Sequence, residues 1–332
     1  MISTRHRAVI EFVLDHLVWF ILIAVVALFS FTVPSYFQIG IFANIVEQST
    51  FVATLAIGLS LLIIAGYMDL SVESVMALAA MVIGILFAKS GVGLGLTLTP
   101  AWLIVPVSLA IALAVGAVVG ASNAFFVVRL KMNAFIVTLA AYIWGRGLVV
   151  ALSGGRSAQE LPAELRFLAI ERFLSVPLIA WVSIAATLAF AFILNKTPFG
   201  RHLLLVGGNA TAAYRAGIRV DRLTATTFVL AGAIAGLAGW LLAIRPSGAT
   251  ANLGVGMLFQ TFAAVVIGGV SLKGGVGSLT GVYAGVLLLA SIQTAINLMG
   301  MPAHFTQLIQ GGMVLVAVLL DTVKIAIRKK LA

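Results

Sequence analysis

The chain has 332 residues, of which 62% are hydrophobic and only 9% are charged, and its formal net charge is +10. A soluble domain is roughly half apolar and about a quarter charged, so this composition excludes an ordinary soluble protein and indicates an integral membrane protein. The basic residues cluster in a few loops, as the positive-inside rule expects, which argues against nucleic-acid binding. The chain has no cysteine, so we expect no disulfides and no thiol chemistry.

Long apolar segments follow one another along the whole chain. Many reach the roughly 20 residues that a helix needs to cross the hydrocarbon layer, and the alternating pattern of a transmembrane barrel is absent. The sequence therefore predicts an all-α, polytopic membrane helical bundle of about ten transmembrane helices, forming a single domain over residues 1–332. The predicted spans are 16–33, 46–65, 71–88, 101–127, 134–152, 175–194, 224–244, 254–270, 276–297 and 304–322.

The distribution of basic residues predicts the orientation. The first apolar run follows Arg5 and Arg7 and has no small-residue cleavage site, so we interpret it as a retained membrane helix. If Met1 is cytoplasmic, the alternation of spans places most of the 20 lysines and arginines on the inner side. This bias predicts that both termini are cytoplasmic.

Residues 153–174 form the main outer loop. Its charges balance to zero, and Glu160 and Glu164 lie four residues apart, which is compatible with a short helix on the membrane surface. A solvated loop without a helix is an equally good interpretation. In both cases the loop offers a charged surface on which an outer partner could dock.

Two short polar segments interrupt the apolar pattern, at 64–71 and at 267–275. Each follows an apolar run, carries glycine and then a polar residue before leucine, and leads into another apolar segment, which suggests a distant internal repeat. Interrupted helices at matching positions are typical of a transporter's pathway. If the interruptions lie at membrane depth they line a cavity, because lipid offers no partner for free backbone groups, and if they are plain turns they do not.

The segment 196–222 is unlike the rest of the chain, because it contains five basic residues and only one acidic residue. Gly207-Gly208-Asn209 predicts a turn followed by a helix N-cap, and residues 210–215 favour a helix that Gly217 ends. The sequence therefore predicts a short, exposed cytoplasmic helix between two membrane helices, which a motor protein could use as its docking surface.

The sequence shows no catalytic machinery. It lacks the glycine-rich phosphate loop of an ATPase, because Lys273 is followed by glycine, and so we expect that the chain does not hydrolyse ATP itself. The histidines are scattered and lack metal-ligand spacing, and no nucleophile–base arrangement stands out. We therefore expect no enzyme activity, no metal and no cofactor.

Polar side chains within the spans are rare, and by default they suggest function. The candidates for a translocation pathway are Glu47, Gln48, Asp69, Glu73, Arg146, Gln260, Gln293 and Asn297. Each candidate also has a structural interpretation. The first two could reach the membrane interface, and Asp69 and Glu73 could be turn or first-turn residues that the helix dipole favours. Arg146 could extend outward to the interface, and the amides could hold helices together.

Several ordered motifs resemble a known family. Gly66–Val75, GYMDLSVESV, is similar to the pattern GGIDLSVGSV, and Asn133–Gly155 resembles PxFIxTLxxxxxxRGxxxxxxGG. Phe199–Arg222 follows FGRxxxAxGGNxxAAxxAGIxVxR, and Ala263–Gly285 follows AAVVIGGxSLxGGxGSxxGxxxG. Gln307–Asp321 resembles the ending QxxxGxxxxxAVxxD. Over about residues 44–322 the chain thus resembles the permease subunit of bacterial ATP-binding-cassette (ABC) importers for simple sugars, the ribose/xylose/arabinose/galactose type.

This resemblance implies a heteromeric importer in the bacterial inner membrane. Two permease subunits, identical or homologous, form the pathway; a separate ATPase binds ATP and docks on the cytoplasmic face; and a periplasmic binding protein delivers the sugar. The resemblance also implies that 207–218 is the coupling helix, with contacts to the ATPase from Gly208, Asn209, Ala212, Ala213, Gly217 and Ile218.

The chain departs from the family pattern at four places. Tyr67 and Glu73 replace glycines, Asn133 replaces a proline, and residues 255–259 replace a segment that usually carries a glutamate. Bulk and charge at glycine positions would change a narrow passage or the packing beside it. Importers that share these motifs carry pentoses, hexoses, deoxysugars, polyols or signalling sugars, so the motifs do not specify the solute.

A second class of function is a stand-alone secondary transporter driven by protons or sodium, with Asp69, Glu73 or Glu47 as the carrier. The basic loop with its capped helix favours the importer permease over this alternative. A structural scaffold or channel would account for neither that loop nor the paired interruptions.

Overall fold

The structure is a computed structural model that describes residues 4–302 and isolated positions between 305 and 322, with side chains from His16 onward. The predicted span 304–322, apart from those positions, lies outside the described residues. The first helices are α1 (Thr4–Thr32), α2 (Ile39–Ile64), α3 (Val72–Phe87), η1 (Ala101–Leu103), α4 (Ile104–Ala124), η2 (Phe125–Arg129) and α5 (Ala134–Ser153). The others are α6 (Ala163–Ile170), α7 (Leu178–Lys196), α8 (Pro198–Gly208), α9 (Ala210–Arg215), α10 (Val220–Ile244), α11 (Met257–Ile267) and α12 (Leu279–Leu298).

The predicted polytopic helical bundle is confirmed. Each predicted span from 16–33 to 276–297 contains one helix, except that η1, α4 and η2 form one continuous helical segment in 101–127. Six helical segments of the described chain are long and apolar enough to cross a membrane. The helices α3 and α11 are apolar but shorter. Large apolar side chains such as Phe31, Ile143 and Trp144 are exposed on the outside of the bundle, where lipid would cover them.

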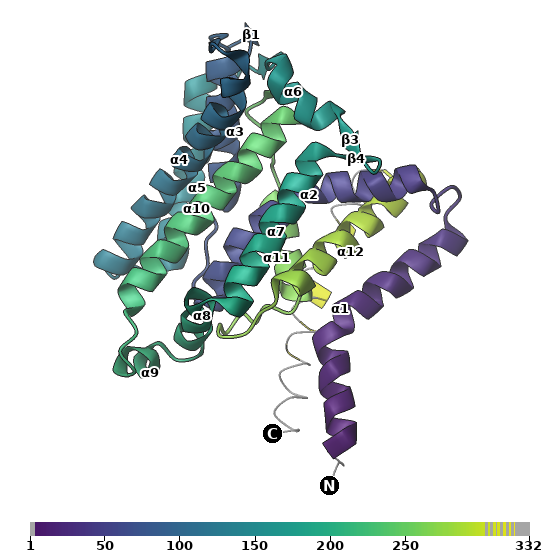
Figure 1. Cartoon of the computed structure of the whole chain (residues 1–332), viewed down its shortest axis with the longest axis vertical. Helices are drawn as coiled ribbons and strands as arrows, with labels where there is room; N and C mark the ends of the chain where they lie inside the picture. The colour runs from purple at the N-terminus through teal and green to yellow at the C-terminus, as the bar shows by residue number, and fades with distance from the viewer. Residues whose placement is uncertain are drawn as a thin grey trace.

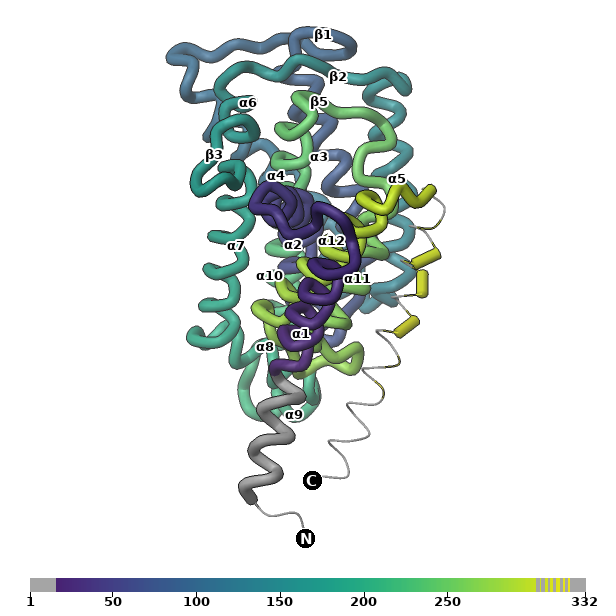
Figure 2. The backbone as a smooth tube through the Cα atoms, turned by 90° about the vertical axis from the view of Figure 1, so that its right-hand side faces the viewer, coloured from purple at the N-terminus to yellow at the C-terminus, as the bar shows by residue number. Residues whose placement is uncertain are grey.

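Five very short strands lie between the helices: β1 (Ser90–Gly91), β2 (Ala158–Gln159), β3 (Arg172–Phe173), β4 (Val176–Pro177) and β5 (Gly248–Ala249). Strand β2 pairs antiparallel with β1 on one side and with β5 on the other. We call this extremity of the molecule the strand end, and the opposite extremity, which carries α9, the α9 end (Figures 1 and 2).

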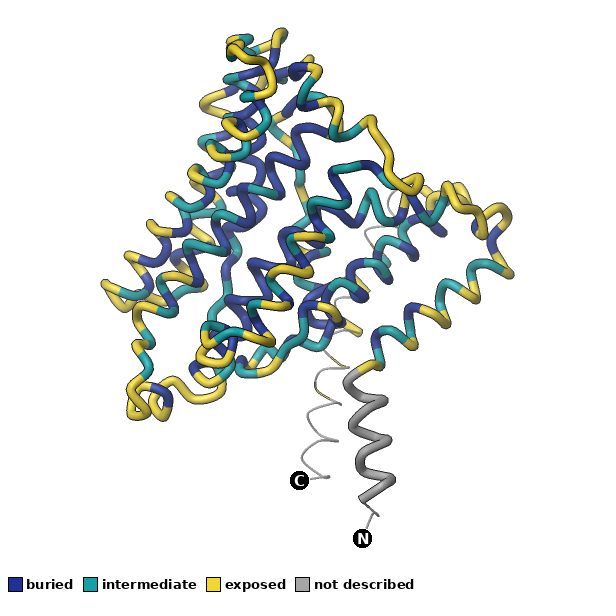
Figure 3. The backbone as a smooth tube through the Cα atoms, viewed as in Figure 1, coloured by how far each residue is buried: buried dark blue, intermediate teal, exposed yellow. Residues whose placement is uncertain are grey.

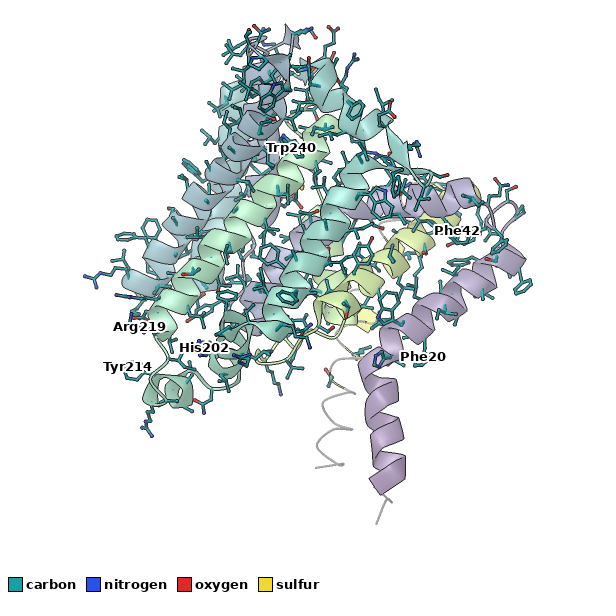
Figure 4. The ribbon with its side chains drawn as sticks, in the orientation of Figure 1. Phe20, Phe42, His202, Tyr214, Arg219 and Trp240 are labelled. Atoms are coloured by element: carbon teal, nitrogen blue, oxygen red, sulfur yellow. The ribbon has the colours of Figure 1, made fainter. Side chains whose placement is uncertain are left out.

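The helices α4 and α10 cross at very short distance. A Cβ atom added at Gly116 or Gly120 of α4 would overlap backbone atoms of α10, and one added at Gly232 or Gly236 would overlap backbone atoms of α4. Small residues spaced by four are the usual means by which membrane helices approach closely. Closer to the strand end, the Trp240 indole of α10 donates a hydrogen bond to a serine hydroxyl of α4 at 2.9 Å (Figure 4).

The buried residues form two main clusters. One joins α3 and α10 with parts of α4 and α5, and the other joins α2, α11 and α12 with parts of α1 and α7. Figure 3 shows α2, α3 and α10 as mostly buried, with exposed residues concentrated on the outer helices and the loops. The helix α2 contributes to both clusters and so lies between the two halves of the bundle.

Candidate functional site

The segment between α7 and α10 forms the α9 end and contains one helix more than the sequence predicts. Pro198 starts α8, where the missing amide hydrogen of proline is no disadvantage. The predicted turn at 207–209 is therefore wrong in detail, because Gly207 and Gly208 complete α8 and only Asn209 is extended. The apolar side of α8, including Leu203 and Val206, is buried.

The short helix α9 has the predicted ends. The Asn209 side chain accepts a hydrogen bond from the Ala212 amide at 2.9 Å, and Gly217 ends the helix with a positive φ of 85°. The amide of Ile218 donates to the Ala213 carbonyl at 3.1 Å, which completes a glycine-based cap. Ala213 is buried, whereas Gly208, Asn209, Ala212 and Gly217 are exposed and Ile218 is half-buried. Figure 4 shows Tyr214 and Arg219 at this extremity, and both residues are exposed.

The end of α8 touches both predicted interruptions. A Cβ atom at Gly207 would overlap the carbonyl oxygen of Ile64, the last residue of α2, and would come within 2.5 Å of the Gly275 amide nitrogen. That amide itself donates to the Ile64 carbonyl at 2.8 Å. We call this contact among Gly207 of α8, Ile64 of α2 and Gly275 the glycine junction. It connects the α8–α9 segment to the backbone of both interruptions without an intervening side chain.

The first interruption enters the bundle as non-helical chain. After Gly66, with a φ of 89°, residues 67–71 lead to α3 among buried residues. The Leu70 amide donates to Thr138 Oγ1 of α5 at 3.1 Å, and Asn123 of α4 donates to Ser71 Oγ at 2.9 Å. Because neighbouring helices satisfy these polar groups, non-helical backbone can lie inside the bundle.

Asp69 belongs to the local structure of this interruption. One of its carboxylate oxygens accepts hydrogen bonds from the Ser71 amide and the Ser71 hydroxyl, at 2.7 and 2.6 Å. The residue is 2% exposed and lies apart from the cavity described below. This geometry favours the turn interpretation of Asp69 over a role as an ion carrier.

The second interruption is a turn beside α8. The helix α11 ends at Ile267, and Gly269 follows with a φ of 90°, so that both interruptions begin with the same local geometry. Residues 268–278 then lead directly into α12.

A third irregular segment, which the apolar pattern did not predict, precedes α11. The predicted span 254–270 contains only 11 helical residues, Met257–Ile267. Such a helix is about 16 Å long at about 1.5 Å per residue, against a hydrocarbon thickness of about 30 Å. Residues 250–256 connect it to β5 at the strand end without a helix. The glycines at 254 and 256, both with positive φ, are the sequence signal that could have indicated this segment.

Two of the predicted pathway residues hold this segment in place. Glu73, the second residue of α3, forms a buried ion pair with Arg146 of α5. The other carboxylate oxygen of Glu73 accepts a hydrogen bond from the Leu258 amide at 2.8 Å. Arg146 donates a hydrogen bond to the Leu253 carbonyl at 3.0 Å. The side chain of Glu73 is 1% exposed and that of Arg146 is 16% exposed. This Glu73–Arg146 pair therefore contacts the backbone within 250–256 and at the start of α11.

Three predicted amides come together between α2, α11 and α12. Gln48, Gln260 and Gln293 line a cavity of about 70 Å³, together with Phe259 and small or apolar residues. Gln48 donates to the Asn44 side chain, and Gln293 donates to the Asn297 side chain at 3.0 Å. We call this the amide cavity. Its volume has room for about two water molecules, at about 30 Å³ each, and none of the residues that line it in the described chain is charged.

Glu47 lies outside the amide cavity and connects two distant segments of the chain. Its carboxylate pairs with Arg245 at the end of α10 at 3.0 Å and with Arg172 of β3 at 3.4 Å. Of the two interpretations of residues 153–174, the structure has the one with a short helix, α6, and the hairpin β3–β4 follows it. The eight predicted pathway residues therefore fall into separate groups, of which only Gln48, Gln260 and Gln293 line the cavity.

The helical bundle, its interrupted helices and the exposed helix α9 define a polytopic transport protein. The family described as "Branched-chain amino acid transport system / permease component" matches residues 41–318. This chain belongs to that family, as the permease subunit of an ABC importer.

Curated relatives cover most of the chain. It is 35% identical over 297 residues to the L-arabinose ABC transporter permease of Azospirillum brasilense, covering 89% of this chain and 84% of the relative. It is 32% identical over 307 residues to the ribose import permease of Escherichia coli strain K12, covering 91% and 92%. It is 33% identical over 285 residues to the autoinducer 2 import permease of Yersinia pestis strain Pestoides F, covering 86% and 78%. No solved structure matches.

Family membership decides between the two classes of function. The chain is a multi-pass membrane permease of a bacterial ABC importer, so it is a transport subunit and not an enzyme. It carries no cofactor, because the ATPase partner binds ATP, and the importer also includes a binding protein. The stand-alone secondary transporter has no support from these comparisons.

Proposed function

We propose that this permease carries a neutral, hydroxyl-rich solute, a simple sugar or a sugar-like molecule, through a pathway that includes the amide cavity. The supporting observation is the lining of that cavity: three amides and the exposed ring of Phe259, with no charged side chain among its described lining residues. Amides both donate and accept hydrogen bonds, as sugar hydroxyls require, and an aromatic ring can stack on a sugar face.

The same lining disfavours an amino acid as the solute, although the family description names one. An amino acid carries an ammonium and a carboxylate, and charged groups inside a membrane are unfavourable unless they are paired or hydrated. The relatives described above are named for L-arabinose, ribose and autoinducer 2, which agrees with a neutral polar solute.

The solute assignment is tested by uptake into vesicles that contain the complete importer. We expect ATP-dependent uptake of labelled arabinose or ribose and none of leucine. Replacing Gln260 with leucine should lower sugar uptake about tenfold, because it removes a hydrogen-bonding group from the cavity. Gln159→Leu, on an exposed part of β2, is the matched control and should transport normally. Uptake of leucine in place of sugars would overturn the assignment.

We further propose that residues 196–222 are the cytoplasmic coupling loop of a single permease domain spanning 1–332. In this arrangement α9 enters a groove on the ATPase, with contacts from Gly208, Asn209, Ala212, Ala213, Gly217 and Ile218. The α9 end then faces the cytoplasm of a bacterial inner membrane, and both termini are cytoplasmic. Its capped helix, its exposed residues and its basic flanks support this orientation.

The coupling loop is tested by co-purification with the ATPase encoded beside the permease. Replacing residues 209–218 with a Gly/Ser linker should abolish co-elution on size-exclusion chromatography, because the linker cannot reproduce the capped helix. The linker variant should itself remain folded, since most residues of α9 are exposed. Co-elution that survives the replacement would show that the ATPase docks elsewhere.

We also propose that a second permease subunit, identical or homologous, completes the pathway. The face that carries the amide cavity includes Phe259, which is 67% exposed, and the exposed Asn297. A second subunit against this face would enclose the cavity between two sets of amides.

Uptake should stop when the ATPase is inactivated and should persist when the ion gradient is collapsed.

A further inference from the structure

Two of the departures from the family pattern meet in the structure. Glu73 stands where the pattern has glycine, and residues 255–259 stand where the pattern usually carries a glutamate. The two positions touch although they are 185 residues apart in the sequence, because the Leu258 amide donates a hydrogen bond to Glu73 Oε2. A carboxylate is therefore present beside 255–259 in this chain, but it arrives from α3.

We propose that Glu73 is a positioning residue that holds the start of α11 against the bundle, through its ion pair with Arg146 and its bond to the Leu258 amide. Within 255–259, position 258 is the one from which a carboxylate could take over this role. The Leu258 side chain is buried with residues of α3, whereas Phe259, the next residue, lines the amide cavity. A glutamate at 258 would thus begin on the side of α11 where Arg146 contacts Glu73.

The arginine makes the carboxylate necessary. Arg146 is mostly buried, and its partners are Glu73 and the Leu253 carbonyl. Its Nε atom has no hydrogen-bond partner among the described residues. Removing one member of a buried ion pair leaves an uncompensated charge, which is strongly unfavourable. Without a carboxylate, the guanidinium should move away from Leu253, and the 250–256 segment should lose its main polar anchor.

The position of α11 matters for transport because α11 carries Gln260 and Phe259 into the amide cavity. The helix has only 11 residues, and the chain before it is irregular. The Glu73–Arg146 pair holds the backbone at two points, at Leu253 before the helix and at Leu258 in its first turn. The pair acts on the pathway through α11 and does not itself line the cavity.

The test exchanges the carboxylate between the two helices. Glu73→Gly should lower uptake at least about tenfold and should accelerate hydrogen–deuterium exchange of the 250–258 amides in the purified permease. Leu258→Glu alone should also impair uptake, because two buried acids then share one arginine. The double variant Glu73→Gly with Leu258→Glu should return both measurements to within about threefold of the unaltered chain.

The matched control places the acid one residue further along. Glu73→Gly with Phe259→Glu should remain impaired, because a side chain at 259 lies in the amide cavity. Equal recovery from both second substitutions, or recovery from neither, would overturn the proposal, as would a Glu73→Gly variant that behaves like the unaltered chain. If Glu73→Gly does not accumulate, the yield of the two folded double variants replaces uptake as the measurement: a higher yield with Leu258→Glu supports the proposal, and equal yields overturn it.

The inference rests on the proposed function only through the uptake measurement. Amide exchange is measured without substrate, ATPase or binding protein. An importer that fails to take up any sugar would therefore refute the proposed solute, while the exchange comparison would still decide the role of Glu73.

Discussion

Replacing Gly232 with valine should prevent α4 and α10 from packing. A Cβ atom at this position would overlap the carbonyl oxygen of Gly116 and would touch the backbone of Gly120. Overpacking a well-packed interior usually costs about 1–3 kcal/mol, and we expect at least the upper end of this range because the obstacle is backbone and cannot rotate away. The melting temperature of the purified protein, followed by tryptophan fluorescence, should fall sharply or the folded form should not accumulate.

Gly147→Val provides the comparison for this prediction. Gly147 lies in the exposed part of α5, and a Cβ atom there would meet nothing within 4 Å. Both substitutions place the same β-branched residue in a membrane helix, so they share the loss of helix propensity. Equal melting temperatures for the two variants would show that the α4–α10 contact is not as close as the structure has it.

Replacing Gly207 with alanine should separate ATP hydrolysis from transport. The added methyl group would overlap the Ile64 carbonyl oxygen and would displace α8 from the glycine junction. Since α9 itself is untouched, we expect the variant to bind the ATPase while uptake falls by about tenfold or more, equivalent to about 1.4 kcal/mol in the activation free energy. Co-elution, ATPase rate and uptake are measured on the same reconstituted preparation.

The control for Gly207 is Gly147→Ala, which adds a methyl group in open space. If Gly207→Ala transports as fast as this control, the glycine junction does not transmit a movement of α9 to the membrane helices. If it instead fails to bind the ATPase, the substitution has disturbed α9, and its effect on uptake would not support transmission through the junction.

The order of the membrane helices could be predicted from the sequence because it depends on hydropathy, which is a local property. The cap of α9 was equally accessible, since Asn209 and Gly217 act on backbone groups within a few residues of themselves. Asn133, which replaces the family's proline, also caps its own helix, because its side chain accepts hydrogen bonds from the amides of Phe135 and Ile136. Such interactions need no knowledge of the tertiary structure.

The contacts that define the site could not be predicted in the same way. The partner of Glu73 is 73 residues away in α5, and Glu47 pairs with arginines from two distant segments. Each of these charges looked like an isolated pathway candidate until the helices were placed. The short length of α11 was hidden because residues 254–256 adjoin a long apolar run, and hydropathy averaged over such a run does not show where a helix begins.

The small β1–β2–β5 sheet affects how the bundle can move. Its strands follow α3, α5 and α10, so hydrogen bonds at the strand end fasten the C-terminal ends of these three helices to one another. The elements that line the amide cavity, α2, α11 and α12, contribute no strand to it. We therefore expect the fastened helices to share one pivot at the strand end, so that a displacement applied at α9 moves their opposite tips farthest. In the orientation proposed above, the protein would be stiffer where a delivery partner docks and more compliant where a motor pushes.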